Sequence, residues 1–200
     1  LQIIDEQADT IARIVRQLLT LARPFNLQRE AVGLTQLIHD VVDLIQPDAI
    51  AHKIQIIPTT SDHLQVDGDR NLLHQVLLNL CLNALHVMPN GGSLRIDTFA
   101  QEQHKDGRAF IALRVSDTGP GIALEHLPNI FDPFFTTKEV GQGTGLGLTV
   151  SRRIIEEHGG WIEAENQSEG GASFTVWLPK VMEAAHLVPL HTPQEAGTSK

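Results

Sequence analysis

Two asparagines and a histidine share one face of a predicted helix. Asn79, Asn83 and His86 are spaced by four and three residues in an otherwise apolar segment that runs to about Met88, so their side chains project from the same side. An amide oxygen is a neutral, hard ligand of the kind that Mg²⁺ accepts while it keeps several waters. The asparagines could equally be structural, because a buried amide without a partner costs about 1–3 kcal/mol. Taken alone, this helix face favours the structural interpretation.

The turn Asp117-Thr118-Gly119-Pro120-Gly121-Ile122 directly follows a predicted strand. A carboxylate at the end of a strand can accept a hydrogen bond from an exocyclic amine such as that of adenine. The two glycines allow a tight turn and the close approach of a flat ring. An ordinary Asp-Gly turn has a similar composition, so this motif also needs support from the others.

A glycine-rich loop, Gly141-Gln142-Gly143-Thr144-Gly145-Leu146-Gly147-Leu148, leads into a predicted helix. Its glycines leave backbone N–H groups free to point at an anion, and the helix N-terminus adds a partial positive charge. Thr144 can add a hydroxyl donor. A dinucleotide-binding loop is excluded because no strand precedes it, and a Walker loop because no Gly-Lys-Ser/Thr follows.

Three of the seven phenylalanines fall within Phe131-Asp132-Pro133-Phe134-Phe135-Thr136-Thr137-Lys138. This segment lies in a long loop between the two glycine motifs, which predicts a lid that packs when a ligand arrives. Lys138 could meet a phosphate. The alternative is a hydrophobic anchor for the loop, and it holds in part for Phe131.

In this order and spacing, the four motifs resemble the N, G1, F and G2 boxes of sensor histidine kinases. The wider superfamily includes type II topoisomerases, a heat-shock chaperone and mismatch-repair ATPases. The resemblance covers about Asp69 to Pro179, and the FDPFFTTK and GTGLGL wording is closest to the nitrogen-regulatory type. It implies an α+β fold of the Bergerat type: a two-layer α/β sandwich with a mixed, mainly antiparallel sheet, ATP held between helices, and a mobile lid.

The resemblance also implies roles for single residues. Asn83 matches the metal-binding asparagine, and Asp117 matches the adenine-binding aspartate. We expect Asn79, Asn83 and Lys138 to be catalytic, with ATP and Mg²⁺ as cofactors. The expected ATP-binding residues are Asn79, Asn83, His86, Asp117, Gly119, Gly121, Ile122, Phe134, Lys138, Gly143, Thr144, Gly145, Leu146 and Gly147.

Three activities fit such a site. The first is transfer of the γ-phosphoryl group of ATP to a histidine. The second is ATP hydrolysis that drives a conformational switch, but the topoisomerase relatives place a glutamate where this chain has Asn79, and an amide cannot act as a general base. The third, a non-catalytic ATP-binding module, is disfavoured because all four motifs are intact.

The elements that must position these motifs can be predicted from periodicity and turn residues. We expect helices over residues 34–50, with Pro47 breaking the last turn, from an Asp69 cap to about residue 88, and over 148–157. Expected strands cover residues 54–58, 94–100, 109–117, 161–165 and 173–178, with a hairpin at Asp106-Gly107. This order predicts helices on one face of a mainly antiparallel sheet.

A heptad pattern over residues 3–23 predicts an amphipathic bundle helix that Arg23-Pro24 ends. The resemblance makes residues 1–24 the second helix of a dimerisation hairpin, followed by a linker over 25–33, the catalytic domain over 34–180 and a flexible tail or linker over 181–200. The first helix, which carries the phosphoacceptor histidine, is expected to precede this piece. The implied partners are that helix, in cis or across a homodimer, and the receiver domain of a response regulator.

The totals exclude several classes of protein. A net charge of −9, from 24 acidic and 15 basic residues, argues against nucleic-acid binding. One cysteine, Cys81, rules out a disulfide framework within the chain and favours a reducing compartment. No apolar run can cross a bilayer, so we expect no membrane contact here and a cytoplasmic domain, whose parent protein can be anchored in the bacterial inner membrane.

Overall fold

The computed structural model describes residues 26–61, 63–105, 108–138 and 143–181. The predicted bundle helix over residues 3–23 and nearly all of the predicted tail lie outside the described residues, as do Gly141 and Gln142 of the glycine-rich loop.

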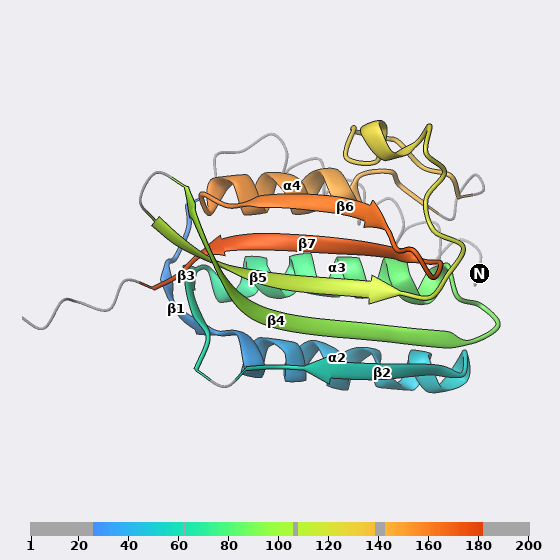
Figure 1. The fold of residues 1–200 in the computed structure, drawn as a ribbon, viewed down its shortest axis with the longest axis horizontal. Helices are drawn as coiled ribbons and strands as arrows, with labels where there is room; N and C mark the ends of the chain where they lie inside the picture. The colour runs from blue at the N-terminus through green and yellow to red at the C-terminus, as the bar shows by residue number, and fades with distance from the viewer. Residues whose placement is uncertain (1–25, 62, 106–107, 139–142, 182–200) are drawn as a thin grey trace, which may run out of the picture.

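The described chain folds into two layers (Figure 1). A five-stranded sheet has the order β2-β4-β5-β7-β6, in which only the β2–β4 pair is parallel. The three α-helices all lie on one face of this sheet. The predicted two-layer α+β fold is therefore confirmed. The elements are β1 (Glu30–Gly33), α2 (Leu34–Ala51), β2 (Ile54–Thr59), β3 (Gln65–Gly68), α3 (Arg70–His86), β4 (Gly92–Lys105), β5 (Arg108–Asp117), a short 3-10 helix (Leu127–Asn129), α4 (Gly147–Glu157), β6 (Trp161–Asn166) and β7 (Ala172–Pro179).

Helix α2 does not break at Pro47 as predicted but continues to Ala51. Proline removes one backbone donor from a helix and crowds the preceding turn. Pro47 itself is exposed, whereas Ile45 and Ala49 on either side of it are buried in the core. The packing of this apolar face outweighs the local cost of the proline.

Strands β1 and β3 form a separate two-stranded antiparallel sheet that the sequence did not reveal. β1 falls within the range predicted as a linker, and its pairing with β3 makes Glu30–Gly33 part of the folded domain. Each of these strands has only four residues, too few for a clear alternation of polar and apolar side chains. The domain therefore begins before the predicted start at Leu34.

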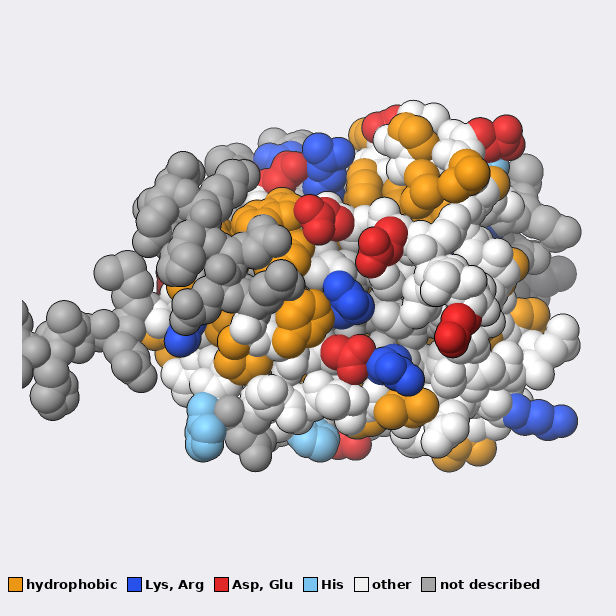
Figure 2. Space-filling model, in the orientation of Figure 1, with side chains coloured by type: hydrophobic (Ala, Val, Ile, Leu, Met, Phe, Trp, Pro, Cys, Tyr) orange, Lys and Arg blue, Asp and Glu red, His pale blue; other side chains and the backbone are white. Residues whose placement is uncertain are grey.

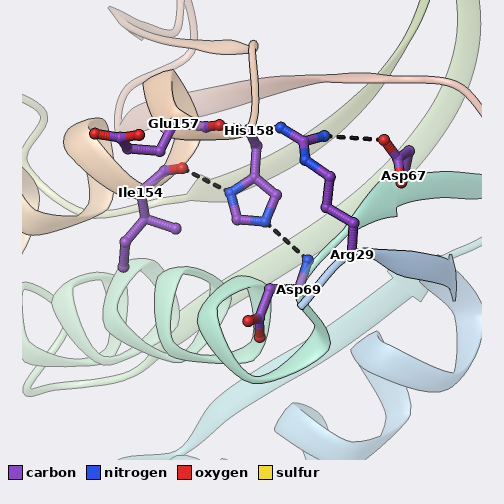
Figure 3. A network of polar contacts seen from close by, with 6 residues as sticks. All are labelled: Arg29, Asp67, Asp69, Ile154, Glu157 and His158. Atoms are coloured by element: carbon purple, nitrogen blue, oxygen red, sulfur yellow. Dashed lines mark hydrogen bonds and ion pairs between the residues drawn. The ribbon is translucent and has the colours of Figure 1, made fainter. Parts of the chain in front are cut away.

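The start of α3 and the end of α4 are joined through a buried histidine (Figure 3). Asp69 caps α3 as predicted: its carboxylate accepts hydrogen bonds from the backbone N–H groups of Asn71 and Leu72 at 3.0 and 3.2 Å. The Asp69 backbone N–H in turn donates to Nε2 of His158, at 2.9 Å, while Nδ1 of His158 lies 2.7 Å from the Ile154 carbonyl oxygen. His158 thus fixes the ends of the two helices relative to each other.

The entering chain is attached to the same junction. The Arg29 guanidinium contacts the Asp67 carboxylate at 2.9 Å and the Glu157 carbonyl oxygen at 3.0 Å, and the Gln28 N–H donates to the Asp69 carboxylate at 3.1 Å. These contacts bind the segment before β1 to both α3 and α4.

The face of the sheet opposite the helices carries hydrophobic side chains among charged ones (Figure 2). An aromatic cluster lies on this face. The Trp161 and Trp177 rings stack with centroids 5.5 Å apart, and both indole N–H groups donate to the Glu163 carboxylate at 3.0 Å. Phe110 packs against Trp161, and Phe99 contacts Trp177 edge to face. The main core, formed by the helices and the other face of the sheet, is separate from this cluster.

Among the described residues, no helix has the length and apolar character needed to span a bilayer.

Candidate nucleotide-binding site

Asp117 ends β5 and is 4% exposed. Its Oδ1 accepts hydrogen bonds from the backbone N–H groups of Gly119, at 2.8 Å, and Ala172, at 3.3 Å. Burial raises the pKa of this carboxyl, and the two backbone hydrogen bonds oppose that effect. Within the described residues Oδ2 has no hydrogen bond, so one oxygen fixes the carboxylate and the other is available to a ligand.

The two glycines of the turn are needed for different reasons. Gly121 has a φ of +77°, a conformation that side chains rarely adopt. A Cβ on Gly119 would lie 2.9 Å from Oδ1 of Asp117, so glycine lets the backbone approach the carboxylate. Thr118, which directly follows Asp117, also has a fixed side chain. Its hydroxyl accepts a hydrogen bond from the Ser93 N–H at 2.9 Å and lies 3.6 Å from the Met88 sulfur.

Helices α3 and α4 meet at Asn79. Its Nδ2 donates to the Ser151 hydroxyl at 3.0 Å. A Cβ on Gly147, the first residue of α4, would lie only 2.5 Å from Oδ1 of Asn79. The close approach of the two helices therefore leaves little room for a side chain at 147 and gives Asn79 a structural contact beside the glycine-rich loop.

Asn83 lies one turn further along α3 and faces the lid segment. The Lys138 ammonium is 3.5 Å from Oδ1 of Asn83. His86 is exposed at the end of α3, and partial desolvation lowers its pKa, with further lowering by the charges of Lys138 and His52. The structure thus brings the predicted Lys138, Asn83 and His86 to one end of α3.

The lid segment also contacts the glycine-rich loop. Phe134 is 64% exposed and has a φ of +67°. A Cβ on Gly145, whose φ is +64°, would lie 2.4 Å from the Phe134 carbonyl carbon, and one on Gly143 would lie 2.7 Å from the Thr136 hydroxyl. These two glycines let the loop pack against the lid backbone.

The remaining residues of these motifs are placed as follows. Leu146 is fully buried, and its N–H donates to the Thr144 hydroxyl at 3.3 Å, so its side chain belongs to the core rather than to the ligand face. The half-buried Phe131 contacts Phe174 edge to face, with centroids 6.4 Å apart. This contact supports the interpretation of Phe131 as an anchor.

The sequence did not reveal the residues whose side chains form hydrogen bonds to the motifs. The Gln167 amide donates to the Asp117 carbonyl oxygen at 2.8 Å, and the Asn166 amide bonds to Ile122. Ser151, the partner of Asn79, was also missed. These partners lie 44 to 72 residues from the groups they hold, so no local pattern in the sequence could have revealed them.

Asn83 offers a single amide oxygen, and the Lys138 ammonium lies 3.5 Å from it. Among the described residues there is no group of three or more His, Cys, Asp or Glu side chains that could hold a metal ion. A site built on the Asn83 amide oxygen fits Mg²⁺, which takes few protein ligands beside a phosphate. A pocket of about 600 Å³ does lie near Phe131, Arg152 and Glu156, but none of the predicted ATP-binding residues lines it.

Residues 68–182, more than half of the chain, match the family described as histidine kinase-, DNA gyrase B-, and HSP90-like ATPases. The sensor histidine kinase ZraS of Escherichia coli (strain K12) is 39% identical over 179 residues, which cover 89% of this chain and 37% of ZraS. The chain thus spans little more than a third of that relative's length.

Solved structures of histidine kinases have the same fold. The catalytic domain of histidine kinase ThkA is 34% identical, with a TM-score of 0.66, and the match covers 76% of this chain and 98% of that domain. ThkA in complex with the response regulator protein TrrA gives 31% identity and a TM-score of 0.71 over 89% of this chain and 49% of that one. Full-length ShkA in complex with AMPPNP is 27% identical, with a TM-score of 0.74, and the match covers 88% of this chain and 37% of that one. This chain therefore belongs to the histidine kinase-, DNA gyrase B- and HSP90-like ATPase family, as a histidine kinase catalytic domain.

Proposed function

We propose that this domain binds ATP with Mg²⁺ and transfers the γ-phosphoryl group to a histidine of a helix outside this chain. The observation that carries the proposal is the Asp117 carboxylate: it is buried, its Oδ1 is fixed by two backbone N–H groups, and its Oδ2 is available. That geometry suits the exocyclic amine of adenine, and ShkA, a relative of the same fold, is described in complex with the ATP analogue AMPPNP.

The phosphates would lie at the other end of the site, between α3, the lid and the start of α4. Gly143, Thr144, Gly145 and Gly147 offer backbone N–H groups at the N-terminus of an 11-residue helix, which favours anions. Lys138 and His86 add cationic or hydrogen-bonding groups at the end of α3. Asn83 would hold Mg²⁺, whose charge offsets that of the phosphates.

Transfer would form a bond between a histidine ring nitrogen and the γ-phosphorus. The bond between the γ-phosphorus and the β–γ bridging oxygen would break, so that ADP leaves, and the ring would lose a proton. The chain's own residues position the phosphates for in-line attack and neutralise their charge.

We further propose that residues 1–24 form the second helix of the dimerisation hairpin, that residues 181–200 form a tail or linker, and that the whole protein passes the phosphoryl group to a response regulator. The ThkA–TrrA complex supports such a partner. We propose a cytoplasmic location for the domain.

ATP hydrolysis is the second candidate activity, and Asn79 argues against it. Its amide lacks the basicity to activate water, and it is bonded to Ser151. The test mixes this chain, ATP and MgCl₂ with a separate piece of the parent that carries the upstream helix. We expect phosphohistidine on the helix. Phosphate release by this chain alone that Asn83→Ala abolishes would favour hydrolysis, and ATP binding without either product would favour a non-catalytic module.

A further inference from the structure

One side chain fixes the end of the turn that follows β5. Ile122 is the last residue of the Asp117 turn, and its N–H donates to Oδ1 of Asn166 at 2.7 Å. The Nδ2 of Asn166 donates back to the Ile122 carbonyl oxygen at 2.6 Å. Both backbone groups of Ile122 are thus satisfied by a single amide, whose orientation the two bonds define together.

Asn166 makes this contact from the end of β6, which is one of the two edge strands of the five-stranded sheet. An edge strand has free hydrogen-bonding positions along one side. Here the Asn166 amide pairs with Ile122 in the way a neighbouring strand would, although the two residues are 44 apart in sequence. The loop beyond Ile122, which leads to the lid segment at residues 131–138, therefore starts from a defined position on the sheet edge.

The turn between β6 and β7 presses on the rest of the Asp117 turn as well. A Cβ on Gly121 would lie 2.9 Å from Oδ1 of Asn166, and one on Gly171 would lie 1.9 Å from the Asp117 carbonyl oxygen. The Gln167 amide donates to that same carbonyl oxygen at 2.8 Å. The β6–β7 turn is consequently in close contact with both ends of the Asp117 turn.

We propose that Asn166 is a positioning residue for nucleotide binding. It acts through Ile122: by fixing the backbone there, it sets the conformation of the turn that presents Asp117. This inference rests on the proposed function of Asp117 as the adenine contact. Asn166 itself touches Ile122 and Gly121 rather than the reacting groups, so it has no catalytic role.

The side-chain contact is exposed, so its loss should loosen the turn more than it destabilises the fold. Asn166→Ala removes both hydrogen bonds. Asn166→Asp keeps an acceptor for the Ile122 N–H and loses the donor to the carbonyl oxygen. The matched control is Ser168→Ala in the same turn, because Ser168 is exposed and makes no side-chain hydrogen bond among the described residues.

The experiment measures the Kd of ATP with MgCl₂ by calorimetry, the Tm, and the hydrogen exchange of the Ile122 amide. For Asn166→Ala we expect about tenfold weaker ATP binding, comparable to the loss of one or two hydrogen bonds, with faster exchange at Ile122 and a Tm close to that of Ser168→Ala. Asn166→Asp should keep the Ile122 amide protected through its remaining acceptor, but its second oxygen would repel the Ile122 carbonyl oxygen, so ATP binding should weaken in this variant too.

A lowered Tm with unchanged ATP affinity would show a merely structural role and overturn the inference. Equal exchange at Ile122 in Asn166→Ala and Ser168→Ala would also overturn it, because the contact would then not hold the turn in solution. If the unaltered chain fails to bind ATP, the proposed function fails, while the exchange of Ile122 still reports on the Asn166 contact separately.

Discussion

Asn79 on α3 donates a hydrogen bond to the Ser151 hydroxyl on α4, at 3.0 Å, and its Oδ1 lies 2.5 Å from the position that a Cβ on Gly147 would take. Asn79, which we predict to be part of the nucleotide site, is therefore also part of the interface between two helices. The position of Asn79 depends on how closely α3 and α4 approach each other. The glycine-rich loop leads directly into α4, so its geometry depends on the same distance.

Gly147→Ala should disturb this interface. The new methyl group would lie 2.5 Å from Oδ1 of Asn79, and relief of such overpacking costs about 1–3 kcal/mol. We expect the free energy of unfolding, measured in urea, to fall by that amount and ATP affinity to fall with it. Gly33→Ala is the matched control: a Cβ there meets nothing within 4 Å, so the change should stay within about 0.5 kcal/mol. Equal effects of the two substitutions would contradict the close approach of α3 and α4.

Asp117→Asn should weaken ATP binding, because an amide accepts a hydrogen bond less strongly than a carboxylate. A hydrogen bond to a charged group is worth about 1.5–3 kcal/mol, so the Kd from calorimetry should rise about 10- to 100-fold. Glu169→Gln, an exposed residue of the β6–β7 turn, is the control for charge alone. Unchanged affinity in Asp117→Asn would remove the adenine assignment.

The same carboxylate predicts a pH dependence of ATP binding. Burial raises the pKa of Asp117, so on acidification it becomes protonated before an ordinary aspartate does. ATP affinity should therefore decline as the pH falls, and the decline should begin at a higher pH than the protonation of an ordinary aspartate would give. Calorimetry across a pH series checks this, with Asp117→Asn as the reference that lacks the titrating group. A parallel decline in both proteins would assign the effect to another residue or to ATP itself.

His158 should make the fold less stable in acid. Its burial lowers its pKa below the ordinary value of 6.5, so the unfolded chain binds this proton more readily than the folded one. Stability that is present above pH 6.5 is then lost as the pH falls toward the folded pKa. His158→Gln should be less stable at neutral pH but show a smaller fall in Tm between neutral and mildly acidic solution. The exposed His39→Gln should keep the dependence of the unaltered chain, and loss of it there would contradict the assignment.

Lys138→Ala should reduce ATP affinity in a salt-dependent way. Lys138 lies 3.5 Å from Asn83, beside the proposed phosphate site, where a charge-assisted contact gains free energy in low salt and loses it to screening. We expect about a 3- to 30-fold increase in Kd at low ionic strength and a smaller difference at high salt. Lys180→Ala removes an exposed charge beyond β7 and should change the Kd little; similar effects of both would indicate a general rather than a local charge effect.

Elements with strong local signals could be predicted from the sequence. The Asp69 cap, the amphipathic period of α2 and the alternating strands led to the observed layers, and the order of the motifs indicated the family. The ends of elements were less predictable: α3 stops at His86, and β4 extends to Lys105. Pro47 shows the limit of local reasoning, because the packing of the helix around it decided the outcome.

Within the site, the sequence indicated which motifs matter but not how they are supported. That Asn79 bonds to Ser151, or that the Asn166 amide pairs with Ile122, depends on the sheet order and on helix contacts that join distant segments. The roles of the predicted ATP-binding residues stay predictions. Their grouping around α3, the lid and the start of α4 is consistent with those roles.

The stacked tryptophans on the open face of the sheet have a practical consequence. Trp161 and Trp177 are the chain's two tryptophans, and a single carboxylate, Glu163, binds both indoles. All of the tryptophan fluorescence therefore originates from one spot on the side of the sheet opposite the helices. A fluorescence unfolding curve will report the disruption of this tryptophan stack. A variant that loosens only the lid or the Asp117 turn can therefore lose nucleotide binding while its fluorescence signal stays unchanged.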